Sequence, residues 1–236
     1  VVAETYDGFL SDINGMHVKA HHVFKALDSA VTGRVAEGNV GSGTGMICHG
    51  FKGGIGTASR MLPDECGGWT VGVLVQANYG QRHRLSIDGV PVGEAVPVAD
   101  VPAPGLISEG AGSIIVLVAT DAPLIPIQCR RLAQRASLGI GRVGGLGENG
   151  SGDLMLAFTT AHHGLQPDEV SSPISVSMLA QSGMNPLFEA VVEATEEAIV
   201  NALCAATTMT GANNRVVHEL PLDALEAVMR RYGRLA

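Results

Sequence analysis

Lysine is rare in this sequence and occurs only at positions 19, 25 and 52. The 236 residues carry a formal net charge of −8 and show no basic stripe. Proteins that bind nucleic acid neutralise its phosphates with clustered lysine and arginine. The composition therefore argues against a nucleic-acid partner.

Long hydrophobic runs are also missing. The longest ones, such as residues 113–119, fall far short of the roughly 20 residues that a helix needs to span a bilayer. We therefore expect no membrane partner. No signal peptide is visible and there is no starting methionine, so we expect the chain to be part of a longer precursor.

Cysteine pairs that mark redox or zinc sites are absent. The four cysteines lie far apart, at positions 48, 66, 129 and 204, without a C-x-x-C spacing. Such cysteines are typical of reduced, buried thiols. They predict a cytoplasmic protein, with the periplasm left open if an export signal has been removed.

Aromatic residues make up only 4% of the chain, whereas apolar residues make up 46% and glycine occupies 31 positions. This composition predicts a folded domain with a core of small aliphatic side chains and many tight turns. Strands are expected at 69–77, 113–120 and 154–160, and helices at 15–30, 121–136, 185–210 and 221–232. The order predicts a single layered α/β sandwich over residues 1–236.

One boundary in the middle of the chain is abrupt. Residues 91–112 carry four prolines and several glycines with little periodicity, which predicts an exposed, cleavable linker. The continuous apolar run at 113–120 predicts a central strand that is buried on both faces.

The glycine clusters at 38–60 do not make a nucleotide site. Gly45 and Gly50 have the separation of a P-loop, but Phe51 and Lys52 follow where a lysine and then a serine or threonine are required. No convincing helix follows residues 41–45, so the dinucleotide fingerprint fails too.

Histidines occur in two close pairs, at 17 and 21 and at 162 and 163. Neither pair has an evident third ligand, and adjacent residues on a strand point to opposite faces. We therefore predict no metal site, and the sequence predicts no cofactor.

Ser113 stands at the start of the central strand, directly after Gly112. A serine hydroxyl can attack a preceding glycine carbonyl because glycine has no side chain to block the strained conformation. Hydrolysis of the resulting ester would leave Ser113 with a free α-amine, whose pKa of about 7.7–8.0 lets it deprotonate its own hydroxyl. Taken alone, the Gly-Ser step favours the simpler interpretation of a polar residue that begins a strand.

A conventional serine hydrolase is not indicated. No Gly-x-Ser-x-Gly elbow surrounds Ser113 or Ser151, and no Ser-x-x-Lys occurs. A catalytic triad would have to be assembled from distant residues.

Six segments up to about residue 165 form a distinctive series. They are Glu4-Thr-Tyr-Asp-Gly, Glu37-Gly-Asn-Val-Gly-Ser-Gly-Thr-Gly, Gly50-Phe-Lys-Gly-Gly-Ile-Gly-Thr-Ala-Ser-Arg, Val75-Gln-Ala-Asn-Tyr-Gly, Gly112-Ser-Ile-Ile-Val-Leu-Val-Ala-Thr-Asp-Ala-Pro-Leu and Asn149-Gly-Ser-Gly-Asp. In this order they resemble the L-aminopeptidase/D-esterase family of self-processing N-terminal serine hydrolases, which includes the β-aminopeptidases.

The resemblance implies an αββα sandwich of the aminopeptidase/ornithine-acetyltransferase type, with its N-terminal part missing from this chain. It also implies cleavage between Gly112 and Ser113. Residues 1–112 would then be part of an α chain, residues 113–236 would be the β chain, and the processed heterodimers would assemble into a homo-oligomer.

The resemblance further implies a set of site residues. The family's oxyanion-binding asparagine matches Asn78. Its second serine and the acidic partner match Ser151 and Asp153, which we expect to orient and polarise Ser113. Tyr6 matches a tyrosine of the family's active site.

The function implied is an autocatalytically processed aminopeptidase, amidase or esterase that acts on small peptides, amides or esters. Glu4 is expected to hold the substrate's free ammonium. Asp153 stands where some β-aminopeptidases have glutamate, which favours α-amino-acid substrates. Two alternatives stay open. An acyltransferase of the ornithine-acetyltransferase type is one, although that group uses threonine where this chain has Ser113. An inactive truncated homologue that binds small amines is the other.

Overall fold

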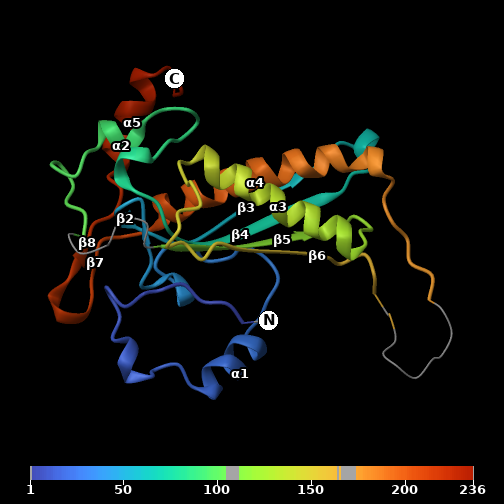
Figure 1. Ribbon diagram of the computed structural model, residues 1–236, viewed down its shortest axis with the longest axis horizontal. Helices are drawn as coiled ribbons and strands as arrows, with labels where there is room; N and C mark the ends of the chain where they lie inside the picture. Colours follow the sequence, from blue (N-terminus) through green and yellow to red (C-terminus); the bar gives the residue numbers. More distant parts are fainter. Residues whose placement is uncertain (1, 105–111, 164, 166–173, 236) are drawn as a thin grey trace.

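The main sheet has four strands in the order β3-β4-β5-β6. The computed structural model describes residues 2–104, 112–163, 165 and 174–235. β3 (Gly54–Met61), β4 (Thr70–Asn78) and β5 (Ser113–Thr120) pair antiparallel, and β5 pairs parallel with β6 (Leu154–Thr159). The parallel pair requires a crossover, which helix α3 (Pro126–Arg142) supplies (Figure 1).

Helices α3 and α4 (Met184–Ala205) cover one face of this sheet (Figure 1). Alternate residues of β4 and β5 are fully or almost fully buried against them, as the two-residue period of a strand requires. These residues are Val71, Val73, Val75, Ile114, Val116 and Val118. Glycine allows close approach here: a Cβ on Gly56 of β3 would lie 1.9 Å from the Ala198 carbonyl oxygen of α4.

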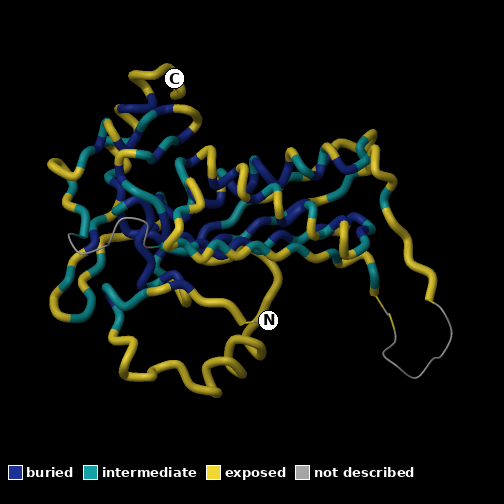
Figure 2. Tube along the Cα trace, viewed as in Figure 1, coloured by how far each residue is buried: buried dark blue, intermediate teal, exposed yellow. Residues whose placement is uncertain are grey.

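The opposite face of the sheet is more open in the described part of the chain. Leu154, Leu156 and Phe158 of β6 are exposed, and Leu117 of β5 is only half-buried. The prediction that residues 113–120 are buried on both faces is therefore wrong for the face away from α3 and α4. Helix α1 (Ala20–Asp28) has no buried residue, and Figure 2 shows it and its flanking segments exposed.

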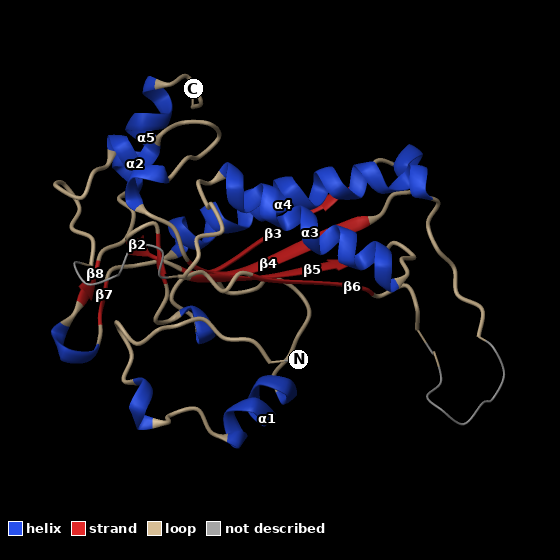
Figure 3. Ribbon diagram, in the orientation of Figure 1, coloured by secondary structure: helices blue, strands red, loops and turns tan. Residues whose placement is uncertain are grey.

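The remaining elements are short. They are β1 (Ile47–Cys48), β2 (Phe51–Lys52), β7 (Met209–Thr210), β8 (Val216–Val217), α2 (Val92–Ala95), α5 (Leu222–Arg231) and the 3₁₀ turns η1 (Ile13–Gly15), η2 (Gly41–Gly43), η3 (Asp64–Cys66), η4 (Arg82–Arg84), η5 (Gln181–Gly183) and η6 (Ala212–Asn214). Figure 3 shows how much of the chain between them is loop. None of the described helices has the length and hydropathy needed to cross a bilayer.

The structure corrects several expected helix limits. The helix predicted at 15–30 is α1 at Ala20–Asp28, and the helix predicted at 185–210 ends at Ala205. The helix predicted at 121–136 begins at Pro126, because the Asp121 carboxylate accepts the Thr70 N–H at 2.7 Å and ties the turn to β4. It continues to Arg142 because Gly139 fits against α4 instead of ending the helix, as a Cβ there would lie 2.6 Å from the Val192 carbonyl oxygen.

The expected linker at 91–112 is also shorter than predicted. Val92 and Val96 are buried in the core, and α2 forms between them. The prolines there fit a packed turn as well as an open loop. Residues 105–111 lie outside the described residues.

The four cysteines are free thiols. The prediction that they are buried holds for Cys48, whereas the other three are half-buried. Burial raises the pKa of the Cys48 thiol to about 12 and keeps it protonated.

Candidate active site

The candidate site lies at the end of the β4–β5 ladder. Asn78 is the last residue of β4 and pairs directly with Ser113, the first residue of β5. Gly112, the residue that precedes Ser113, forms a parallel bridge with Ser151. The sheet register therefore brings together four residues that are up to 73 positions apart, from 78 to 151.

The N–H of Gly152 contacts both partners of the expected cleavage. It donates to the Gly112 carbonyl oxygen at 3.3 Å and to the Ser113 Oγ at 3.2 Å. One donor shared between two acceptors is a three-centre hydrogen bond. A Cβ at position 152 would lie 3.2 Å from the Ser113 Oγ, so glycine gives the hydroxyl its room here.

Ser151 and Asp153 flank this donor. The Ser151 hydroxyl donates a hydrogen bond to the Asp153 carboxylate. The Ser151 N–H donates to the Glu148 carbonyl at 2.8 Å, and the Glu148 side chain accepts hydrogen bonds from Gln81 and Arg84. The turn that carries both residues is thus anchored to the segment after β4. Both residues lie just before β6.

The side chain of Asn78 is fixed at both ends and is 6% exposed. Its Oδ1 accepts the Ile47 N–H at 2.8 Å, and its Nδ2 donates to the Tyr6 carbonyl at 2.9 Å. A carboxamide has two N–H groups, so the contact with Tyr6 uses only one of them.

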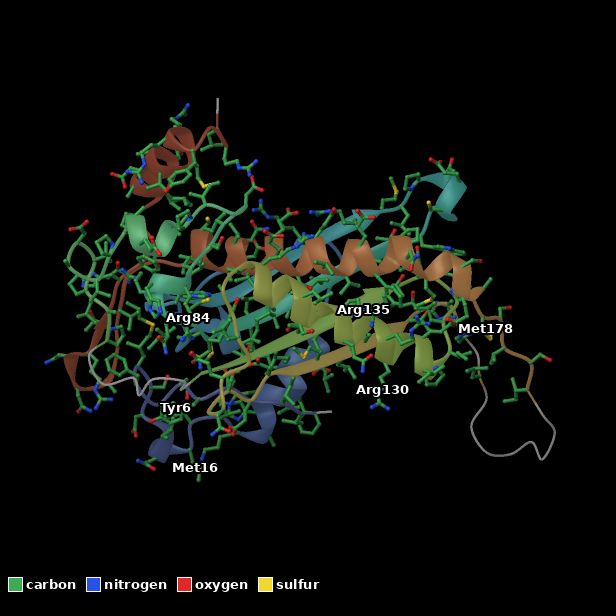
Figure 4. The ribbon with its side chains drawn as sticks, turned by 45° about the horizontal axis from the view of Figure 1, so that its top comes forward. Tyr6, Met16, Arg84, Arg130, Arg135 and Met178 are labelled. Carbon is green, nitrogen blue, oxygen red and sulfur yellow. The ribbon has the colours of Figure 1, made fainter. Side chains whose placement is uncertain are left out.

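Tyr6 reaches the site through its backbone. Its side chain is 66% exposed, and the ring folds back over Gly8, where a Cβ would lie 2.5 Å from the Tyr6 hydroxyl. Tyr6 and Arg84 lie at the end of the sheet where β5 begins (Figure 4).

Glu4 is exposed. The next residue, Thr5, is buried and accepts a hydrogen bond from Gln76 of β4 at 2.6 Å. This bond keeps the N-terminal segment next to β4. No hydrogen bond or ion pair joins Glu4 to Asn78 or Ser113 within the described ranges.

A polar pocket opens beside the predicted cleavage point. Its lining residues are Tyr79, Gly80, Arg84, Gly112, Gly144, Gly145, Leu146, Gly147, Glu148, Ser151 and Asp153. Burial raises the pKa of the Tyr79 hydroxyl well above its ordinary value, with smaller contributions from Cys48 and Asp153. Burial also lowers the pKa of His49, which packs edge-on against Tyr79, to about 4, so its imidazole is neutral at pH 7.

Sequence reasoning missed two donors of this site. They are the backbone N–H groups of Gly152 and Ile47, which no residue type marks. The glycines on both sides of Ser151 were the available signal for the first, because a backbone N–H can approach a neighbour closely where side chains are absent.

A family model now gives the site its context. The model described as "Peptidase family S58" matches residues 1–217. The chain belongs to this peptidase family. The predicted resemblance to serine aminopeptidases is confirmed, and with it membership of a hydrolase family.

Individual relatives agree with this assignment. "Beta-peptidyl aminopeptidase BapA" of Sphingosinicella microcystinivorans is 48% identical over 246 residues, which cover 100% of this chain and 62% of that protein. Among solved structures, a Burkholderia sp. β-aminopeptidase is 51% identical with a TM-score of 0.89, covering 97% of this chain and 63% of its own.

An L-aminopeptidase D-ala-esterase/amidase from Ochrobactrum anthropi, described as a variant of the Ntn hydrolase fold, is 47% identical with a TM-score of 0.90. The match covers 98% of this chain and 62% of that one. The predicted α/β fold class is confirmed. The chain spans less than two thirds of the length of these relatives.

Proposed function

We propose that this chain belongs to a self-cleaving serine aminopeptidase and carries its nucleophile. The observation that carries the proposal is the Gly152 N–H, which lies 3.3 Å from the Gly112 carbonyl oxygen and 3.2 Å from the Ser113 Oγ. A donor in this position can polarise the carbonyl while the neighbouring hydroxyl attacks it.

In the proposed self-cleavage, the Ser113 Oγ attacks the Gly112 carbonyl carbon. The hydroxyl proton passes to Ser151 as Ser151 gives its own proton to the Asp153 carboxylate, to which its hydroxyl donates. The C–N bond then breaks, the proton returns from Asp153 through Ser151 to the Ser113 nitrogen, and an ester between Gly112 and the Ser113 Oγ remains. Water hydrolyses this ester to give the Gly112 carboxylate and a free Ser113 hydroxyl and amine. Residues 1–112 and 113–236 would then be separate chains.

Turnover would reuse the same groups. The freed α-amine, with an ordinary pKa of about 7.7–8.0, can take the hydroxyl proton of Ser113 near neutral pH. The remaining N–H of Asn78 and the N–H of Gly152 would stabilise the oxyanion, an effect of about 2.7–4 kcal/mol for one donor. Attack on the substrate carbonyl releases an amine or alcohol, and water then releases the acyl group.

The substrates we propose are small peptides, amides or esters with a free amino group. Glu4 would be the anion that holds this ammonium, and the exposed ring of Tyr6 would border the binding site. The relatives support this class, since their names describe a β-peptidyl aminopeptidase and an aminopeptidase with D-ala-esterase and amidase activity. We further propose that the protein is cytoplasmic and that its processed heterodimers form a homo-oligomer. Size-exclusion chromatography with light scattering would test the oligomeric state.

Intact mass spectrometry of the protein beside Ser113→Ala tests the mechanism. The unaltered protein should give two fragments that meet between Gly112 and Ser113, whereas the variant should stay uncut and fail to hydrolyse an aminoacyl anilide. Ser137→Ala, at an exposed position on α3, is the matched control and should cleave and hydrolyse normally. Equal hydrolysis by Ser113→Ala and the unaltered protein would defeat the proposal. Acyl transfer to ornithine in the same assay would favour the acyltransferase instead.

A further inference from the structure

Lys52 of β2 is a buried cation bonded only to the backbone. Its side chain is 0% exposed, and its ammonium donates to the carbonyl oxygens of Gly43 at 3.1 Å, Met46 at 2.8 Å and Gly53 at 2.7 Å. An ammonium has three N–H groups, so all of them are used. Within the described residues no carboxylate pairs with Lys52. A buried charge without a counter-ion is costly, which points to a specific use.

One of these carbonyls belongs to a peptide group that also contacts Asn78. The Met46 oxygen accepts hydrogen bonds from Lys52 and from the Gly53 N–H, the latter at 2.9 Å. The N–H at the other end of the same peptide group, that of Ile47, donates to the Asn78 Oδ1 at 2.8 Å. Because a peptide group is planar and rigid, fixing its oxygen also fixes the direction of its N–H.

We propose that Lys52 is a positioning residue, which orients and polarises the Asn78 amide through the Met46–Ile47 peptide group. This inference rests on the oxyanion-binding role proposed for Asn78. A cation on the Met46 oxygen makes the Ile47 N–H a stronger donor, because hydrogen bonds in a chain polarise one another. The stronger hydrogen bond from the Ile47 N–H draws electron density towards the Asn78 Oδ1. The free N–H of the same amide therefore becomes a stronger donor to an oxyanion.

The charge of Lys52 is compatible with this role at neutral pH. Burial lowers its pKa to about 8, so most molecules still carry the ammonium at pH 7. A methionine in its place would fill similar space without any donor and would leave the Met46 oxygen to Gly53 alone.

Arg82 provides a matched control. It is also a buried cation bonded to carbonyl oxygens, those of His49, Gly50, Val96 and Val101. None of these four carbonyls belongs to a peptide group that contacts Asn78. Arg82→Met should therefore destabilise the fold without the specific effect of Lys52→Met. Lys25→Met, at an exposed position on α1, controls for loss of a lysine.

The first measurement compares kcat and KM for an aminoacyl anilide, normalised to the fraction of cleaved protein. Lys52→Met should lower kcat about 10- to 100-fold, the loss typical of a displaced reacting group, with KM within about twofold. Arg82→Met and Lys25→Met should keep kcat. An equal fall in kcat for Arg82→Met and Lys52→Met at matched melting temperatures would overturn the inference.

A double-mutant cycle tests whether Lys52 acts through Asn78. In the Asn78→Ala background, Lys52→Met should change kcat by less than about twofold, because the group it positions is gone. Full additivity of the two substitutions would contradict the proposal.

Amide hydrogen exchange gives a readout independent of activity. Lys52→Met should speed exchange of the Ile47 N–H more than Arg82→Met does, and unchanged exchange would refute the proposed link. If the unaltered protein neither cleaves nor hydrolyses, the proposed function fails, while the exchange experiment still tests the link from Lys52 through the Met46–Ile47 peptide group to the Asn78 side chain.

Discussion

Acid should destabilise this protein through one buried histidine. His49 is 0% exposed, and its Nδ1 lies 3.0 Å from the Gln81 carbonyl oxygen. Its Nε2 has no hydrogen-bond partner among the described residues. A proton added to Nε2 would place a charge in a buried site without an acceptor, so the folded state resists protonation.

The size of this effect follows from the pKa of His49. Burial lowers it from 6.5 to about 4; Arg82 and Arg84 oppose the charge further, while the Gln81 carbonyl and Glu148 favour it. Between these two pH values the unfolded chain binds a proton that the folded chain does not. Stability is therefore fully present above pH 6.5 and falls as the pH drops towards 4. Over about 2.5 pH units, at about 1.4 kcal/mol per unit, the loss is about 3 kcal/mol.

Urea unfolding at intervals from pH 7.5 to pH 4 would measure this loss, with His49→Asn as the variant. Asparagine suits the position because residue 49 has a φ of 50°, which asparagine tolerates. The variant is less stable at pH 7.5 but should lose about 3 kcal/mol less of its stability on acidification. His21→Asn, at an exposed position on α1, should behave like the unaltered protein. Parallel curves for His49→Asn and the unaltered protein would refute the reasoning.

Two further substitutions test the packing and the anchoring of the site. Gly56→Ala should lower the free energy of unfolding by about 1–3 kcal/mol, because its Cβ would lie 1.9 Å from a carbonyl oxygen of α4. Gly72→Ala has open space around its Cβ and should raise the free energy of unfolding by about 0.5–1 kcal/mol. Equal effects of the two substitutions in urea unfolding would contradict this reasoning. Glu148→Gln removes the ion pair with Arg84 and should slow self-cleavage about fivefold, about 1 kcal/mol, in a mass-spectrometric time course. Asp88→Asn, in an exposed ion pair, should cleave at the normal rate.

Three strands of the main sheet, β4, β5 and β6, were predictable because their sequence is locally distinctive, whereas β3 was not among the predicted strands. The β-rich segments predicted at 69–77 and 113–120 correspond to β4 and β5 within one residue. The helix limits were less predictable. A glycine such as Gly139 usually indicates the end of a helix, and the sequence does not show its contact with α4. The short helix α2 was hidden for a related reason, because Val92 and Val96 are buried by residues distant in sequence.

In the candidate site, too, the local features were predictable from the sequence and the long-range contacts were not. The Gly112-Ser113 step is local and could be proposed from the chemistry of two adjacent residues. Its partners could not, because the contact of Ser113 with the Gly152 N–H depends on the parallel pairing of β5 with β6. The Ile47 N–H that holds Asn78 is a backbone group, and neither composition nor periodicity marks such a donor.

The position of the proposed cut within the sheet bears on what the protein becomes afterwards. A break before Ser113 would separate β4 from β5 in the chain, yet these strands are paired over eight residues each. Helix α4, from the second fragment, packs against β3 and β4 from the first, and Gly56 lies in that contact. Separation of the fragments would break the ladder and expose the core between sheet and helices. The same register that aligns Ser113 with Asn78 would therefore hold the two fragments together, so cleavage can free an amine without releasing a chain.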